Sequence, residues 1–152
     1  MKYDQDYKSL QILLVDDDEN DRQLLREAIE SDRVDHTMHA IADGEQLMNY
    51  LSLSNVNTPD LIFLDLNMPR KNGMECLVEM RADEKFNNTI IAVYSTSSSK
   101  KEINSVLHAG TNIYITKPNN YLALKKIVSE VLLINWQYHT SSLSKKQFVM
   151  VR

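Results

Sequence analysis

Short apolar runs that stop abruptly at polar residues are the feature that most constrains how this chain can fold. The strong runs lie at residues 12–15, 61–64, 90–94 and 113–116, and a weaker one lies at about 36–41. A short, continuous apolar run is typical of a strand that is buried on both faces of a parallel sheet. The sequence therefore predicts a buried sheet of five strands.

Helices are predicted between and after these runs, because apolar residues recur there at the spacing of an amphipathic helix. The apolar residues of the first four predicted helices are Leu24, Leu25, Ala28 and Ile29, then Leu47, Met48 and Leu51, then Met74, Leu77, Val78 and Met80, then Ile103, Val106 and Leu107. A last helix is predicted at about residues 121–134. Strands that alternate with helices indicate an α/β fold whose parallel sheet is covered on both faces. We expect a flavodoxin-like, doubly wound (βα)5 domain with strand order 2-1-3-4-5.

The predicted elements occupy one domain. Residues 1–9 form a lead-in, residues 10–134 form the domain, and residues 135–152 form a C-terminal extension with no separate output domain. The extension is not disordered by composition, since it holds apolar and aromatic side chains. They are Trp136, Tyr138, Leu143, Phe148, Val149 and Val151. Two interpretations stay open: these residues pack back onto the same molecule, or they form a surface for a homodimer or another partner.

Composition and charge exclude several classes of function. The formal net charge is −4, with 17 basic and 21 acidic residues, so binding to nucleic acid is not expected. No apolar run reaches the roughly 18 residues of a membrane span, and residues 1–10 do not resemble a secretory signal. Cys76 is the one cysteine and can form no internal disulfide, so we expect a cytoplasmic protein.

Polar side chains follow several of the predicted strands at the point where each strand ends. Asp16 and Asp17 follow the first strand, Asp65 the third, Ser95 the fourth and Lys117 the fifth. In such a sheet the carboxyl ends of the strands beside the switch point form the functional site. Clustered carboxylates require a compensating cation, and oxygen ligands with retained waters suit Mg²⁺. An ammonium and a hydroxyl group beside one carboxylate suit phosphoryl transfer, with Asp65 as the nucleophile.

Each of these residues also has a simpler explanation. Acidic residues in the first turn of a helix are favoured by its dipole, which would account for Asp17, Asp18, Glu19 and Asp21. Asp65 could end a strand, Ser95 could belong to a helix cap and Lys117 could be a solvated loop lysine. The functional interpretation is favoured because all of these features fall at the carboxyl ends of strands in one predicted sheet.

The motifs closely resemble those of response-regulator receiver domains. They are LLVDDD at residues 13–18, LDLNMP at 64–69, Gly73, Ser95 and the pair Lys117-Pro118. The resemblance covers about residues 10–134, and it agrees with the fold predicted above. It departs at residue 119, where Asn stands in place of a common aromatic residue, at Asn72, where Asp is frequent, and at Ser95, where Thr is more usual.

The resemblance implies a role for each site residue. Asp65 would be the phosphoacceptor, Asp17 the principal Mg²⁺ ligand and Asp16 an assisting ligand. Asp65 itself and the backbone carbonyl of Asn67 would complete the protein's ligands.

The resemblance further implies a phosphate-binding and switch apparatus. Lys117 would bind the phosphoryl group, Ser95 would be the switch hydroxyl and Tyr114 the switch aromatic. Phosphorylation would draw the Ser95 loop inward and leave space for Tyr114. The Lys117–Pro118 peptide is often cis in the family.

A receiver domain of this kind is a signalling protein with no enzyme activity beyond its own phosphorylation and dephosphorylation. Its expected partners are a sensor histidine kinase or phosphotransfer protein and a downstream protein target. Arg70-Lys71 and Trp136 are similar to features of the regulators that accompany bacterial phytochrome kinases.

Two other functions use the same edge of such a sheet. A haloacid-dehalogenase-like phosphatase also forms an aspartyl phosphate, but it usually has a second Asp where this chain has Asn67, and this chain is short for such an enzyme. A flavodoxin-like cofactor binder is disfavoured by an acidic pocket that would repel a phosphate in the absence of a metal.

Overall fold

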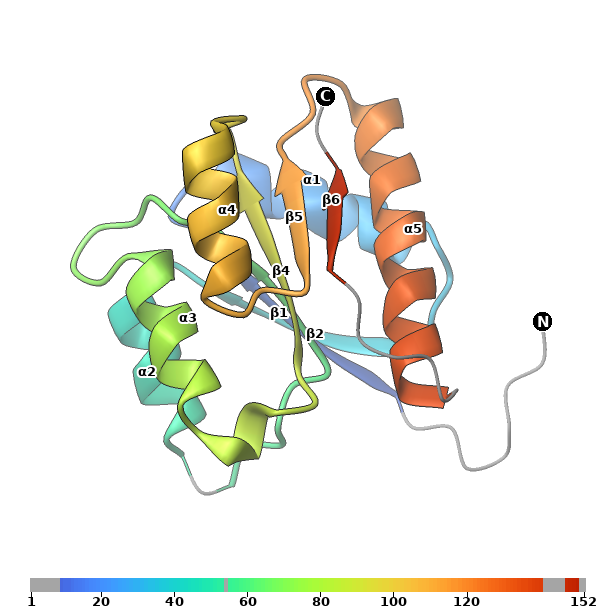
Figure 1. The fold of residues 1–152 in the computed structure, drawn as a ribbon. Helices are drawn as coiled ribbons and strands as arrows, with labels where there is room; N and C mark the ends of the chain where they lie inside the picture. Colours follow the sequence, from blue (N-terminus) through green and yellow to red (C-terminus); the bar gives the residue numbers. More distant parts are fainter. Residues whose placement is uncertain (1–8, 54, 141–146, 151–152) are drawn as a thin grey trace.

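The computed structural model describes residues 9–53, 55–140 and 147–150. Within them the chain forms one parallel sheet of six strands in the order β2-β1-β3-β4-β5-β6 (Figure 1). The strands are β1 (Leu10–Val15), β2 (His36–Ile41), β3 (Leu61–Leu64), β4 (Ile90–Ser95), β5 (Ile113–Thr116) and β6 (Phe148–Met150).

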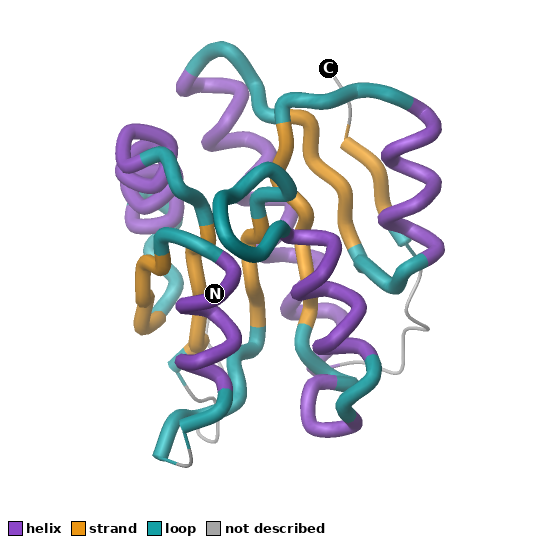
Figure 2. The backbone as a smooth tube through the Cα atoms, turned by 90° about the vertical axis from the view of Figure 1, so that its left-hand side faces the viewer, coloured by secondary structure: helices purple, strands orange, loops and turns teal. Residues whose placement is uncertain are grey.

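Helices cover both faces of the sheet, as Figures 1 and 2 show. They are α1 (Glu19–Glu30), α2 (Gly44–Leu51), α3 (Gly73–Arg81), α4 (Lys100–His108) and α5 (Tyr121–Thr140), with a short 3-10 helix η1 (Glu84–Phe86). Helices α1 and α5 enclose one apolar core against the sheet, and α2, α3 and α4 enclose the other. This arrangement confirms the predicted doubly wound α/β class.

The two cores explain why β1, β3, β4 and β5 contain continuous apolar runs. On β1, Ile12 and Leu14 belong to the core under α1 and α5, whereas Leu13 and Val15 belong to the core under α2 to α4. Successive side chains of a strand point to opposite faces, so a strand covered on both faces has no solvent-facing position.

Side-chain caps fix where the helices begin, and so where the loops at the strand ends stop. The side chains of Asp18, Asp43, Asn72 and Ser99 each accept a hydrogen bond from a backbone N–H in the first turn of α1, α2, α3 and α4. Such caps satisfy N–H groups that have no partner within the helix. Because α1 begins directly after Asp18, residues 16 and 17 remain in the loop at the end of β1.

The prediction of five strands was wrong, because the chain returns after α5 to add β6 beside β5. Phe148 N–H donates to the carbonyl of Asn112 at 2.9 Å, and the Gln147 side chain donates to the carbonyls of Leu107 and Thr111. The order of the first five strands is as predicted. A strand of three residues produces too short an apolar pattern to be recognised in the sequence.

Helix α5 also continues past the predicted end at about residue 134, to Thr140. Tyr138 is buried and its ring lies 6.5 Å from that of Phe148, so both side chains join the core under α1 and α5. Leu143 and Val151 lie outside the described residues. Across the described residues, no helix is both long and apolar enough to pass through a membrane.

Candidate functional site

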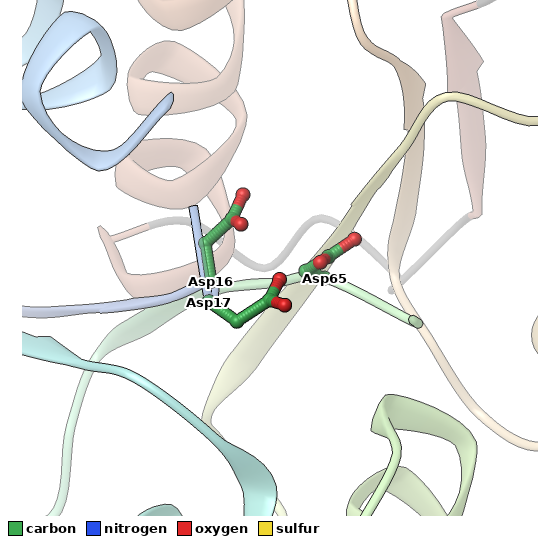
Figure 3. A group of neighbouring side chains, drawn as sticks. All are labelled: Asp16, Asp17 and Asp65. Carbon is green, nitrogen blue, oxygen red and sulfur yellow. The ribbon is translucent and has the colours of Figure 1, made fainter. Parts of the chain in front are cut away.

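Three carboxylates meet where β1 and β3 end. Asp16 and Asp17 directly follow β1, Asp65 directly follows β3, and one carboxylate oxygen from each lies within 4.8 Å of the others. Asp16 and Asp65 are 3% and 6% exposed, whereas Asp17 is exposed to solvent. Figure 3 shows the carboxylate of Asp17 directed towards Asp65. The parallel pairing of β1 with β3 brings these residues together from distant parts of the sequence, as the switch-point argument predicts.

The electrostatics of this cluster disfavour three ionised carboxylates. The pKa of Asp65 is raised from 3.8 to about 7, mainly by burial and also by the neighbouring charges of Asp16 and Asp17, while the charge of Lys117 opposes the rise. Burial also raises the pKa of Asp16, against its hydrogen bond from Lys117. A buried carboxylate is destabilised both by lost hydration and by like charges nearby. The site therefore favours the arrival of positive charge.

The donor set fits a hard divalent cation. Three carboxylate oxygens at this separation can share one ion, and Mg²⁺ prefers oxygen ligands while it keeps several waters. Exposure of Asp17 leaves the cluster open to solvent on one side, where such waters would lie. Asp16, Asp17 and Asp65 are therefore the side chains that could hold a metal.

The loop after β3 is built closely around Asp65. The backbone N–H of Asn67 hydrogen-bonds to the Asp65 carboxylate and lowers its pKa, while the Asn67 side chain is exposed. The Gly73 N–H donates to the Leu66 carbonyl at 2.9 Å, and a side chain at Gly73 would overlap with the Asp65 carbonyl. Glycine is needed there because the chain folds back directly onto the site.

The same loop is tied to α2 by an ion pair. Arg70 lies 2.9 Å from the carboxylate of Asp43, the buried N-cap residue of α2. The adjacent Lys71 pairs with Glu79 on α3. The basic pair singled out in the sequence therefore holds the loop in place and contacts none of the three carboxylates within the described structure.

Lys117 reaches the cluster from the end of β5. Its ammonium nitrogen lies 2.8 Å from Asp16, 2.9 Å from Asp21 and 3.8 Å from Asp65. Burial alone would lower the pKa of Lys117, but its hydrogen bonds to Asp16 and Asp21 outweigh burial and raise it, so the side chain is a permanent cation. The Lys117–Pro118 peptide is trans, since no peptide in the described ranges is cis.

Ser95 and Tyr114 are connected through Ser97. The buried Ser95 hydroxyl accepts from the Ser97 N–H at 3.2 Å, and the Tyr114 hydroxyl donates to the Ser97 carbonyl at 2.7 Å. Tyr114 is fully buried, and its ring belongs to the core under α2, α3 and α4. The Tyr114 ring therefore occupies the interior in this structure, and its movement on phosphorylation stays a prediction.

Sequence reasoning missed two neighbours of Lys117. Asp21, on the first turn of α1, was explained by the helix dipole alone, and its ion pair with Lys117 joins residues 96 positions apart. Tyr94, on β4, lies under the ammonium group, with 5.1 Å from the nitrogen to the ring centroid. The available signal for Tyr94 was strand alternation, which places its side chain on the opposite face of β4 from Ser95.

Comparisons with known proteins agree with this geometry. Residues 12–129 match the family model described as the response regulator receiver domain. Response regulator Rcp1 of Synechocystis sp. is 32% identical over 124 residues, which are 79% of this chain and 84% of that protein. The crystal structure of the phosphorylated cyanobacterial phytochrome response regulator RcpA has a TM-score of 0.81 and 33% identity, and the match covers 90% of this chain and all of that one. The Mn²⁺-bound form of Rcp1 has a TM-score of 0.76 and 29% identity, with coverage of 89% and 99%.

Proposed function

The chain belongs to the response regulator receiver domain family, and from this premise we propose that Asp65 accepts a phosphoryl group and thereby switches the protein between two signalling states. One observation carries the proposal: the carboxylate of Asp65, which keeps 6% of its residue surface exposed, lies beside two further carboxylates and a lysine ammonium group at the carboxyl edge of the sheet.

The proposed reaction is a direct displacement at phosphorus. An oxygen of the Asp65 carboxylate attacks the phosphorus atom of a phosphohistidine, the P–N bond breaks and its electron pair returns to the imidazole ring. The product is an acyl phosphate on Asp65. Asp65 must be ionised to attack, and its raised pKa means that positive charge in the site favours the reactive form.

The other residues of the site would neutralise or orient the phosphoryl oxygens. Asp16, Asp17, Asp65 and the backbone carbonyl of Asn67 would hold Mg²⁺, which supplies charge neutralisation when bound. Lys117 is close enough to Asp65 for its ammonium group to reach a phosphoryl oxygen after a small movement. Ser95 would donate its hydroxyl hydrogen to another of these oxygens.

Neither the fold nor the relatives support the phosphatase alternative. The described sheet and helices are those of a receiver domain, and Asn67 stands where the second Asp of such an enzyme would be.

We include the partners in the same proposal. A histidine kinase or phosphotransfer protein would donate the phosphoryl group in the cytoplasm, and a downstream protein would recognise the phosphorylated surface. The similarity to phytochrome-associated regulators suggests a kinase of that kind as donor. The proposal includes a homodimer, because Leu133 on α5 and Val149 on β6 expose 55% and 46% of their surface.

A phosphotransfer assay tests this function. Autophosphorylated histidine kinases, a phytochrome kinase among them, are mixed with the chain in Mg²⁺, and the radiolabel on each protein is followed with time. We expect rapid transfer from at least one kinase, no transfer to Asp65→Asn, and slow transfer to Asp17→Ala or in the presence of a chelator. Labelling of Asp65→Asn at the wild-type rate would refute the assignment of Asp65.

A further inference from the structure

The ammonium group of Lys117 donates hydrogen bonds to two carboxylates, and neither is that of Asp65, the proposed phosphoacceptor. Its hydrogen bonds to Asp16 and Asp21 are 2.8 and 2.9 Å long, whereas Asp65 lies at 3.8 Å, beyond hydrogen-bonding distance. An ammonium group has three N–H donors, so two of the three are already in use. To turn towards a phosphoryl group on Asp65, the ammonium group would have to move away from the two carboxylates that now hold it.

Asp21 differs from the other carboxylates in position. It lies on α1, one turn from the loop of Asp16 and Asp17, and its oxygens are not part of the metal-binding cluster found among the described residues. Its backbone N–H is bonded to the N-cap residue Asp18, which fixes its place on the first turn. In the part of the chain that the structure describes, its carboxylate pairs with Lys117 alone.

The cost of breaking the two hydrogen bonds is unequal. The Asp16 side chain is 5% exposed, and a buried carboxylate that loses its partner is strongly destabilised. The Asp21 side chain is 32% exposed, so water can replace the ammonium group there. Asp21 is therefore the partner that Lys117 can most readily give up.

The surroundings of Lys117 also favour its present position. Its ammonium group lies over the ring of Tyr94, a contact that stabilises a cation. Asp21, Tyr94 and Lys117 line one hollow of about 160 Å³, on the side of Lys117 where α1 and α5 begin. This hollow gives the side chain room to change its orientation.

We propose that Asp21 is a positioning residue that holds the Lys117 ammonium group beside Asp16 and away from Asp65, and so slows capture of the phosphoryl group. The proposal rests on the function proposed above, in which Lys117 binds a phosphoryl oxygen. Neutralising Asp21 should free one N–H donor of Lys117 for that oxygen, with little effect on the fold.

The test compares Asp21→Asn with the wild type in Mg²⁺, using acetyl phosphate as donor and beryllofluoride as a non-transferable phosphoryl analogue. A partly exposed ion pair is weak, so we expect labelling to be roughly two- to fivefold faster at saturating donor, and beryllofluoride to bind more tightly by a similar factor. Glu19→Gln removes a charge from the same turn of α1 and should behave as wild type. Asp21→Glu keeps the charge and should also behave as wild type.

A double-variant comparison separates positioning from a general effect of charge. In a Lys117→Gln background, Asp21→Asn should change neither quantity, because no ammonium group remains to be released. An unchanged or slower Asp21→Asn, or the same gain in Asp21→Glu or Glu19→Gln, would contradict the proposal. If Lys117→Gln is not labelled at all, the comparison of Asp21→Asn with Asp21→Glu decides. Failure of the wild type to be labelled would instead contradict the function proposed for Asp65.

Discussion

Burial and the like charges of Asp16 and Asp17 together make Asp65 hard to ionise, against the attraction of Lys117. The Asp65 pKa of about 7 means that the folded chain binds this proton far more tightly than the unfolded chain, whose carboxyl titrates near 3.8. Protonation of Asp65 therefore favours the fold. The penalty for ionising it is absent below about pH 4, grows as the pH rises towards 7 and is complete above that value.

The raised pKa of Asp65 predicts how the stability of the fold depends on pH. In a metal-free buffer, Asp65→Asn should be more stable than the wild type, and the difference in free energy of unfolding should grow by about 3 kcal/mol from pH 5 to pH 8. Urea denaturation at several pH values, with a chelator present, measures this difference. A difference that does not change with pH would show that Asp65 has an ordinary pKa in the folded chain.

At the scale of elements, the link between the site and α4 is the segment that follows β4. Ser97 connects the Ser95 hydroxyl to the Tyr114 hydroxyl, and the Ser99 side chain begins α4. A phosphoryl oxygen that attracts the Ser95 hydroxyl would draw it from the Ser97 N–H. The change would then pass to Tyr114 and to the start of α4 through backbone groups already in contact.

We expect the Ser95→Ala variant to accept a phosphoryl group but to show little of the resulting structural change in α4. On phosphorylation, backbone amide NMR shifts of residues 100–108 should change clearly in the wild type and much less in Ser95→Ala. Ser98→Ala serves as a control in the same loop, since Ser98 is exposed. Equal shifts in wild type and Ser95→Ala would exclude the hydroxyl from the coupling.

The elements differ in how far the sequence predicts them. Strand β3 begins and ends where the apolar pattern predicts, at residues 61–64, because burial on both faces makes its consecutive residues apolar. Strand β2 also has its predicted range, residues 36–41. Strand β6 was not predicted, because it has three residues and forms only through pairing with β5.

The residues of the site also differ in how far the sequence predicts their positions. Asp16, Asp17, Asp65 and Lys117 could be placed together from sequence, because the topology of a parallel sheet brings strand ends to one edge. The pairing of Lys117 with Asp21 and Tyr94 could not, because it depends on side-chain orientation across elements that are distant in sequence.

At the scale of the whole molecule, the C-terminal segment extends the sheet, and some apolar side chains near it remain exposed to solvent. Tyr138 and Phe148 pack against the chain's own core, which is the intramolecular interpretation of that segment. Leu133 and Val149 nevertheless remain exposed, on α5 and at the sheet edge formed by β6. An exposed edge strand is a common site of association between chains.

If the protein forms a homodimer through Leu133 or Val149, charge placed at both positions should dissociate it. We expect the wild type to sediment as a dimer and a Leu133→Lys, Val149→Lys double variant to sediment as a monomer, with labelling of Asp65 unchanged. Leu53→Lys is a matched control, because Leu53 is 50% exposed and follows α2. A dimeric double variant would place the interface elsewhere, and a monomeric wild type would remove the homodimer from the proposal.

The central claim is that Asp65 alone accepts the phosphoryl group, and intact-mass spectrometry tests it most directly. The wild type and Asp65→Asn are incubated with Mg²⁺ and acetyl phosphate, and the masses are recorded before the acyl phosphate hydrolyses. The account predicts that the wild type gains the mass of one phosphoryl group and that the folded Asp65→Asn variant gains none. An equal gain in Asp65→Asn, or none in the wild type, would contradict the account.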